Sequence, residues 1–184
     1  MFLKYGISTL MLFINISLSA QAPNWEWARG FGSTGSDNPH GIVCDINGNI
    51  YIIGNTQIQI SFDSIILIGS QFISKFNKDG NVIWAKSVDS EHIWGAGALA
   101  TDINKYVYIT GSFVDTLIFG NDTLISASSL SDIFTAKFDS AGNAIWAKSA
   151  GGNDYDHGTN ICSDINSNIY VTGTFESSSI TFGV

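Results

Sequence analysis

The residues best able to do chemistry lie in three loops, where each histidine of the chain has carboxylates nearby. Imidazole and carboxylate groups together can bind a divalent cation, and calcium is favoured where carboxylates outnumber other ligands. The three histidines stand 5, 10 and 7 residues before the next repeated Asp, so they are not equivalent and need not converge. Solvated polar loops are the favoured interpretation, with no cofactor expected and a calcium or ligand site as the alternative. The loop residues are Asp37, His40, Asp89, Glu91, His92, Asp154, Asp156 and His157.

Two tryptophans outside any repeated position, Trp25 and Trp94, are candidates for contact with a sugar. An aromatic ring with a polar edge suits such a contact. The segment from Asp45 to Asn49 resembles the start of a calcium loop, but position 56 is Thr where such a loop needs a Glu. A hairpin turn is the better interpretation of that segment.

No nucleophile motif, zinc-ligand spacing or phosphate-binding loop is found in the sequence. The chain is therefore not expected to be an enzyme. Three classes of function are ranked in order: a protein or ligand interaction (adhesion) module, a carbohydrate-binding module, and a hydrolase or lyase of an extracellular polysaccharide.

The elements that position these residues are marked by a repeated tryptophan. Trp27, Trp84 and Trp146 are separated by 57 and 62 residues, and Trp84 and Trp146 each end a Gly-Asn-x-x-Trp motif. A period of about 60 residues suits one four-stranded blade of a β-propeller with a long loop. Since they recur within strands, Trp84 and Trp146 are expected to pack between blades.

Each repeat is predicted to hold four strands and a projecting hairpin. The second strand is apolar on nearly every residue, which predicts burial on both faces between neighbouring sheets. The turn before it begins with Asp, whose side chain is expected to cap the turn. The predicted strands are 41–45, 50–54, 72–76 and 82–87 in the first repeat, 98–102, 107–111, 134–138 and 144–149 in the second, and 160–164 and 169–173 in the third, with hairpins over 60–68 and 117–126.

Two segments make the resemblance to a family specific. Residues 132–152 read DIFTAKFDSAGNAIWAKSAGG and residues 164–175 read DINSNIYVTGTF. Both resemble the bacterial SBBP, or beta-propeller repeat, family over nearly all of residues 24–184, with a weaker match at 29–32 and 70–71. The resemblance implies a secreted or surface-attached propeller, often within a longer protein, and implies no catalytic residues. The Gly-Asn-x-x-Trp element is also similar to the docking motif of pyrroloquinoline quinone propellers, without an accompanying cofactor site.

The first 20 residues have the charged start, apolar middle and small-residue end of a secretory signal peptide. Cleavage is expected after Ala20, with Ala22 as the alternative, leaving a secreted or cell-surface chain without a transmembrane segment. The mature chain would carry 7 basic and 16 acidic residues. Scattered lysines and a net negative charge exclude nucleic acid as an expected partner, which leaves an extracellular protein or glycan. Cys44 and Cys162 are expected on opposite strand faces, unable to form a disulfide.

The order of the repeats predicts an open, partial propeller. Residues 21–184 would hold repeat units of about 27–83, 84–145 and 146–184, with two complete blades and parts of others. Because propellers close with four to eight blades, further carboxy-terminal repeats are expected to complete the ring.

Overall fold

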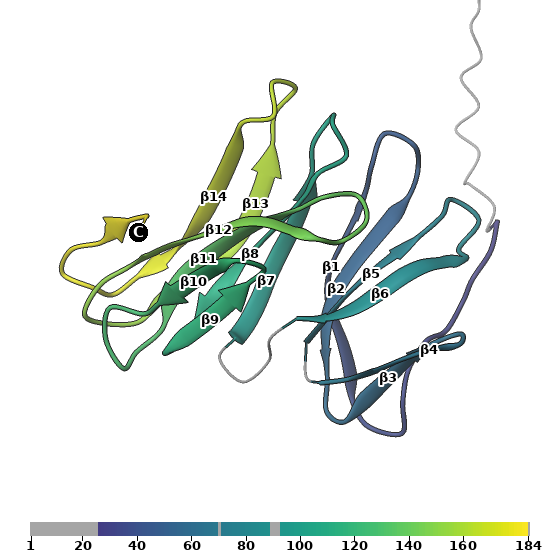
Figure 1. Ribbon diagram of the computed structural model, residues 1–184, viewed down its shortest axis with the longest axis horizontal. Coiled ribbons are helices and arrows are strands. Elements are labelled where there is room, and N and C mark those ends of the chain that lie inside the picture. Colours follow the sequence, from purple (N-terminus) through teal and green to yellow (C-terminus); the bar gives the residue numbers. More distant parts are fainter. Residues whose placement is uncertain (1–25, 70, 89–92, 184) are drawn as a thin grey trace, which may run out of the picture.

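The computed structural model describes residues 26–69, 71–88 and 93–183, and all regular structure in these ranges is β-strand. The strands form separate antiparallel sheets, none of which closes into a barrel (Figure 1). The prediction of an all-β fold of propeller type is confirmed. Among the described residues, no helix is long and apolar enough to cross a membrane.

The first blade is a four-stranded antiparallel sheet with the order β1-β2-β5-β6. A separate hairpin, β3-β4, projects between β2 and β5, as predicted. The bounds are β1 (Asp37–Cys44), β2 (Ile50–Thr56), β3 (Gln59–Phe62), β4 (Ile65–Ile68), β5 (Gln71–Phe76) and β6 (Val82–Val88).

The second blade repeats this design, with strand order β7-β8-β11-β12 and a projecting hairpin, β9-β10. The third unit begins in the same way with the antiparallel pair β13-β14. Two complete blades and part of a third are therefore present, as the sequence predicts. The bounds are β7 (Ile93–Thr101), β8 (Val107–Phe113), β9 (Thr116–Phe119), β10 (Asp122–Ile125), β11 (Asp132–Phe138), β12 (Ala144–Gly151), β13 (Asp156–Ser163), β14 (Ile169–Phe175) and β15 (Thr181–Phe182).

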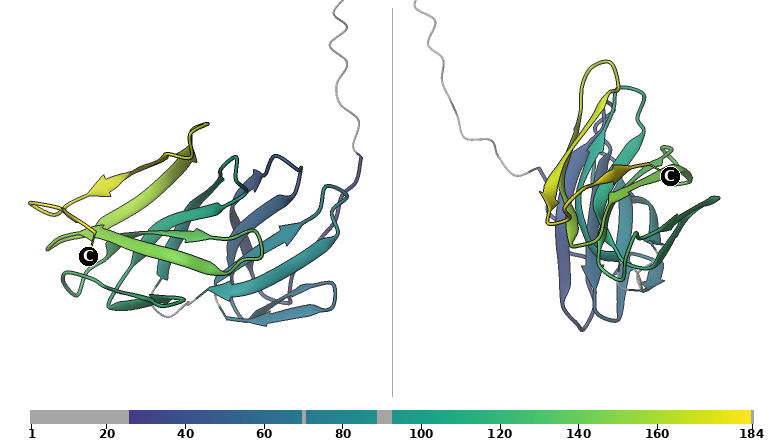
Figure 2. Two further views of the ribbon diagram at one scale, coloured as in Figure 1. Left: turned by 45° about the horizontal axis from the view of Figure 1, so that its top comes forward. Right: turned by 90° about the vertical axis from the view of Figure 1, so that its left-hand side faces the viewer.

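Strand β15 pairs with β12, the last strand of the preceding blade, with Gly151 opposite Thr181. The same contact occurs at the start of the chain, where Gly32 forms an isolated bridge with Ser61. The first blade and the third unit are thus each tied to the last strand of the unit before them. The first strands β1, β7 and β13 also lie side by side (Figures 1 and 2).

The turns are built on a repeated side-chain cap. The Asp45 carboxylate accepts the backbone N–H of Asn47 at 2.9 Å and of Asn49 at 3.0 Å. This pattern confirms the predicted cap, because it recurs at Asn77, Asp102, Asp139 and Asp164. In the turn from Asp45 to Asn49, the positive φ falls on Gly48, at 75°.

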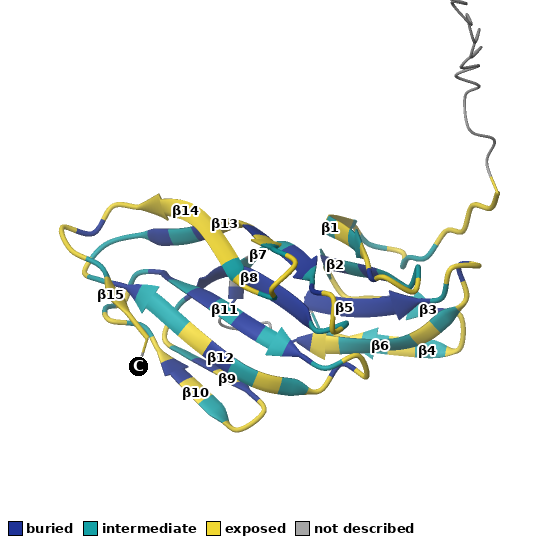
Figure 3. Cartoon of the chain, turned by 90° about the horizontal axis from the view of Figure 1, so that it is seen from above, coloured by how far each residue is buried: buried dark blue, intermediate teal, exposed yellow. Residues whose placement is uncertain are grey.

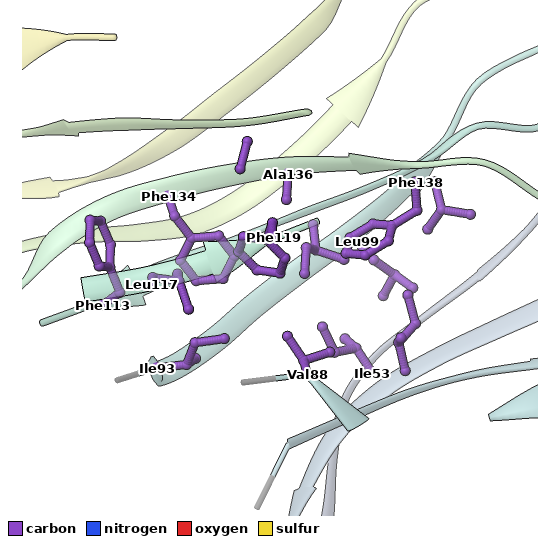
Figure 4. Packing of buried hydrophobic residues seen from close by; sticks show 14 of the residues in the cluster. Ile53, Val88, Ile93, Leu99, Phe113, Leu117, Phe119, Phe134, Ala136 and Phe138 are labelled. Carbon is purple, nitrogen blue, oxygen red and sulfur yellow. The ribbon is translucent and has the colours of Figure 1, made fainter. Parts of the chain in front are cut away.

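A core of buried residues joins the first two blades. Ile53 and Val88 of the first blade face Leu99, Phe134 and Phe138 of the second (Figure 4). Fully burying each such side chain contributes about 1.5–3 kcal/mol. The core therefore holds one blade to the next.

Two of the repeated tryptophans, Trp27 and Trp84, dock on a turn of the blade that follows them. The Trp84 indole N–H donates to the Ser140 carbonyl at 3.2 Å, and a Cβ on Gly142 would lie 2.9 Å from its ring. Trp27 makes the same contact with the Lys78 carbonyl, at 3.0 Å, and with Gly80. Trp84 lies between blades as expected, but it is half-buried because one side of the turn faces solvent.

Candidate functional site

The turns after β1, β7 and β13 form a continuous row. The Thr101 hydroxyl donates to the Cys44 carbonyl at 2.9 Å, and the Ser163 hydroxyl donates to the Thr101 carbonyl at 2.7 Å. Between the last two turns, the Asn104 amide donates to the Ser167 hydroxyl at 3.0 Å. These bonds fix equivalent turns of three successive units against one another.

Each turn of this row presents an isoleucine to solvent. Ile46, Ile103 and Ile165 are 67%, 48% and 80% exposed, and each follows the capping Asp of an Asp-Ile-Asn turn. Single exposed apolar residues are ordinary. Here the same aliphatic side chain recurs on three linked turns, so we define these residues as the isoleucine row. Sequence reasoning treated Asp-Ile-Asn only as a turn and missed the row, although the repeated apolar residue at one turn position was the available signal.

Polar groups beneath the row hold it rigid. The Tyr51 hydroxyl donates to the Asp45 carboxylate at 3.3 Å, and Tyr108 and Tyr170 repeat the contact with Asp102 and Asp164. Burial opposes ionisation of Asp45, but hydrogen bonds from Asn49 and Asn47 outweigh it and lower the carboxyl pKa. The turn is thus charged at neutral pH.

The buried Lys75 links this framework to the next blade. Its ammonium donates to the Ser140 carbonyl at 2.9 Å and lies 5.0 Å from the centre of the Tyr51 ring. Burial lowers the pKa of Lys75, while the charges of Asp45 and Asp139 oppose that effect. The positions of the turns in the first and second blades are therefore coupled.

Asp37, Asp154 and Asp156, the acidic candidates that lie in the described part of the chain, are engaged in hydrogen bonds within the protein. Asp37 accepts the Ser33 N–H at 2.7 Å, and a hydrogen bond from Thr56 is the main cause of its lowered pKa. Asp156 is fully buried and accepts the Ser177 hydroxyl at 2.8 Å. Asp154 accepts the Tyr155 N–H at 2.9 Å. These contacts show loop-stabilising roles for all three carboxylates.

His40 and His157, the two histidines within the described residues, do not form a cluster with these acids. His40 is exposed at a bulge of β1, whereas His157 stacks on Tyr155 with ring centres 6.3 Å apart. Within the described residues, no group of three or more His, Cys, Asp or Glu side chains is arranged to hold a metal ion. Cys44 and Cys162 are free and exposed. Of the other candidates, Trp25, Asp89, Glu91 and His92 lie outside the described residues, and so does the side chain of Trp94 on β7.

A hollow of about 500 Å³ lies between the first two blades, lined by Ile73, Lys86, Phe119, Phe138 and Asn143 among others. The Lys86 ammonium at this hollow donates to the Gly142 carbonyl at 2.7 Å and to the Asn143 side chain at 3.1 Å. The Lys86 ammonium thus stabilises the contact between the first and second blades.

Comparisons with known proteins agree with this architecture. The family model described as SBBP, Beta-propeller repeat, matches residues 26–60. The chain is also 29% identical, over 161 residues, to an uncharacterized WD repeat-containing protein of Acanthamoeba polyphaga mimivirus. That alignment covers 77% of this chain and 12% of the viral protein. The two findings and the four-stranded blades agree on a fold built from propeller-type repeats, with the match to the SBBP model lying at residues 26–60.

Proposed function

We propose that the chain is a non-catalytic propeller module, secreted or held at the cell surface, that binds a partner protein through the isoleucine row. The observation that carries the proposal is the exposure of Ile46, Ile103 and Ile165 on three hydrogen-bonded turns. An aligned set of exposed apolar groups surrounded by polar ones is a feature of protein interaction surfaces.

The energetics favour binding at this row. Burying one isoleucine side chain fully contributes about 1.5–3 kcal/mol. The turns are already fixed by side-chain caps and by bonds between units, so little further ordering opposes association. Asn47, Asn104 and Asn166 stand beside the isoleucines and can supply hydrogen bonds at the rim.

The export part of the proposal is supported by the signal-like composition of residues 1–20. Expression of the full gene in a bacterial host, followed by mass spectrometry of the exported protein, tests it. We expect an amino terminus at Gln21. A protein retained in the cytoplasm with Met1 intact would contradict export.

Binding is tested with a triple variant, Ile46→Ser, Ile103→Ser and Ile165→Ser. The matched control is Ile66→Ser, Ile68→Ser and Ile125→Ser, which removes isoleucines that are 61%, 78% and 69% exposed on the projecting hairpins. Each protein is used to capture partners from an extracellular fraction and is applied to a glycan array.

We expect a protein captured by the wild type and the control to be lost with the triple variant, while thermal unfolding stays unchanged. Equal capture by all three proteins would overturn the proposal. Glycan binding that depends on Trp25 or Trp94, with no effect of the row, would show a carbohydrate-binding module instead.

A further inference from the structure

The hollow of about 500 Å³ between the first and second blades has the size of a pocket for a small molecule. Ile73 lies at its floor on β5, a strand that is buried along its length, whereas the neighbouring β6 is mostly half-buried or exposed (Figure 3). Both blades are complete, so the walls of the hollow do not depend on the third unit.

Two phenylalanine rings form most of the apolar floor. Phe119 of β9 and Phe138 of β11 are 5% and 6% exposed, and their ring centres lie 5.8 Å apart with the ring planes at 85°. Val88 of β6 belongs to the same cluster of buried residues (Figure 4). Ile118 and Ile145 line the hollow from more exposed positions. An apolar surface thus extends from the floor to the mouth.

The repeat places a phenylalanine where this hollow has a valine. Phe31 stands four residues after Trp27, and Val88 stands four residues after Trp84. The two tryptophans make the same contact with the blade that follows them, so Phe31 and Val88 occupy equivalent positions. The hollow therefore lies where a large aromatic side chain is replaced by a small aliphatic one.

The Phe31 ring shows which group suits this position. Its centre lies 5.5 Å from that of Phe62, which ends β3, and 5.1 Å from that of Phe76, which ends β5. Phe119 and Phe138 end the equivalent strands β9 and β11 of the second blade. A phenyl ring is therefore the group that covers this pair of phenylalanines elsewhere in the same chain.

Lys86 places a positive charge at the hollow, and none of the described residues that line it is acidic. An ammonium group has three N–H donors. Lys86 donates to the Gly142 carbonyl and to the Asn143 side chain, both uncharged, and forms no salt bridge within the described residues. The Asp139 carboxylate of the same turn already accepts three N–H groups. One donor of Lys86 therefore remains for an anion.

We propose that this hollow binds an aromatic carboxylate, a small molecule with one aryl ring and one carboxylate group. The ring takes the position that Phe31 has beside the first blade and packs on Phe119 and Phe138. The carboxylate accepts a charge-assisted hydrogen bond from Lys86. The site shares no residue with the isoleucine row, so it can be occupied without the partner protein proposed for that row.

The test titrates the full 184-residue chain with phenylpropionate, its neutral amide and the cationic phenylpropylamine, and follows amide chemical shifts by NMR. We expect saturable binding of phenylpropionate, with shifts at residues 86–88, 118–121 and 142–145. The amide should bind about tenfold more weakly, because it lacks the charge that Lys86 recognises. The amine should not bind.

A peptide that ends in phenylalanine with a free carboxyl group presents the same chemistry from a second source. Its titration is compared with that of phenylpropionate. Tighter binding of the peptide would support the site and make a protein carboxyl terminus the source of the ligand. Tighter binding of phenylpropionate would support a free acid.

Three protein variants test the two halves of the site. Val88→Phe installs the ring found at the equivalent position, and should abolish binding without lowering the thermal unfolding midpoint. Lys86→Gln should weaken phenylpropionate binding about tenfold but leave binding of the amide within about twofold. Lys78→Gln is the matched control, because it removes the same charge from an exposed lysine and should leave binding unchanged.

Four results would overturn the proposal. They are no saturable binding of phenylpropionate or the peptide to the wild type, equal affinity for acid and amide, undiminished binding to a folded Val88→Phe protein, and shifts confined to residues outside the hollow. Lys86→Gln with the acid and amide pair keeps the test decisive if Val88→Phe does not fold.

Discussion

Strands β8 and β14 have nearly the same sequence but very different environments. β8 reads VYITGSF and β14 reads IYVTGTF. Tyr108 and Phe113 of β8 are 2% and 0% exposed, whereas Tyr170 and Phe175 of β14 are 55% and 60% exposed. The difference comes from neighbours, since β8 lies between β7 and β11 and β14 pairs with β13 alone in the described chain.

The contrast shows that an apolar second strand of this fold becomes buried only when another strand pairs with each of its two edges. The backbone pairing and the Asp-Tyr contact are the same in both strands, at 3.1 Å for Tyr108 and 3.2 Å for Tyr170. Local structure is therefore set by residues close in sequence, whereas burial of β8 also needs β11 of the same blade and contact with β13 of the next unit. A repeat protein of this kind gains much of its stability at the interfaces between units.

The largest expected effect is on the free energy of unfolding, and it distinguishes β8 from β14 directly. Phe113→Ala should lower the free energy of unfolding by about 3–5 kcal/mol, because it leaves a cavity in the core between blades. Phe175→Ala should change it by about 0.5 kcal/mol or less, because that ring is exposed. Urea unfolding of both variants checks the comparison. Equal losses would mean that β14 is covered in solution.

A second comparison sets Trp84 against Trp146. Trp84→Ala should cost about 2–4 kcal/mol, since it removes ring contacts with Tyr51 and with the Gly142 turn. Trp146→Ala should cost less, because its indole packs on Tyr108 with no turn against it in the described residues. Thermal unfolding measures both, and a larger loss for Trp146 would reverse our assignment.

The docking turn itself can be tested at its glycine. Gly142→Ala should cost about 1–3 kcal/mol, because a Cβ at a φ of 75° is strained and would lie 2.9 Å from the Trp84 ring. Gly48→Ala is the matched control, since Gly48 has the same φ but its nearest contact is the Lys78 Cβ at 3.4 Å. The control should lose about 1 kcal/mol. Equal losses would exclude a contribution from the tryptophan contact.

The blade order, the projecting hairpins and the turn caps could all be predicted because they depend on residues close in sequence. The Asp45 cap, for example, needs only the N–H groups two and four residues later. The prediction that second strands are buried on both faces was right for β8 and wrong for β14. That burial needs a third strand beside the second, and among the described residues β14 pairs with β13 alone.

The candidate site was harder to predict for a related reason. Asp37, Asp154 and Asp156 were identified as a potential ligand-facing set, but their partners Thr56 and Ser177 lie about 20 residues away and could not be paired from spacing. The isoleucine row was missed because an apolar residue in a turn gives no sign of whether it is covered. The alignment of the turns becomes visible in the folded structure, in bonds such as those between Thr101, Cys44 and Ser163.

The smallest expected effect on stability comes from Asp132, which is 3% exposed and lies where the second blade contacts β13. Its Oδ2 accepts the Ala127 N–H at 2.8 Å, and its Oδ1 has no partner among the described residues. Burial raises the pKa of this carboxyl, and the charge of Asp156 adds to the effect. The folded protein therefore favours protonated Asp132, a stabilisation that is complete below the unfolded pKa and is lost as the pH rises through the folded pKa.

The Asp132→Asn variant has no carboxyl to ionise at this position, so it does not lose this stabilisation as the pH rises. The free energy of unfolding of the variant, relative to that of the wild type, should therefore increase between about pH 4 and pH 7. Asp45→Asn is the control of opposite sign, because the lowered pKa of Asp45 gives a stabilisation that is present at neutral pH and lost in acid. Urea midpoints at the two pH values measure both variants. If Asp132→Asn instead becomes less stable than the wild type at neutral pH, the ionised carboxylate must be stabilised in solution.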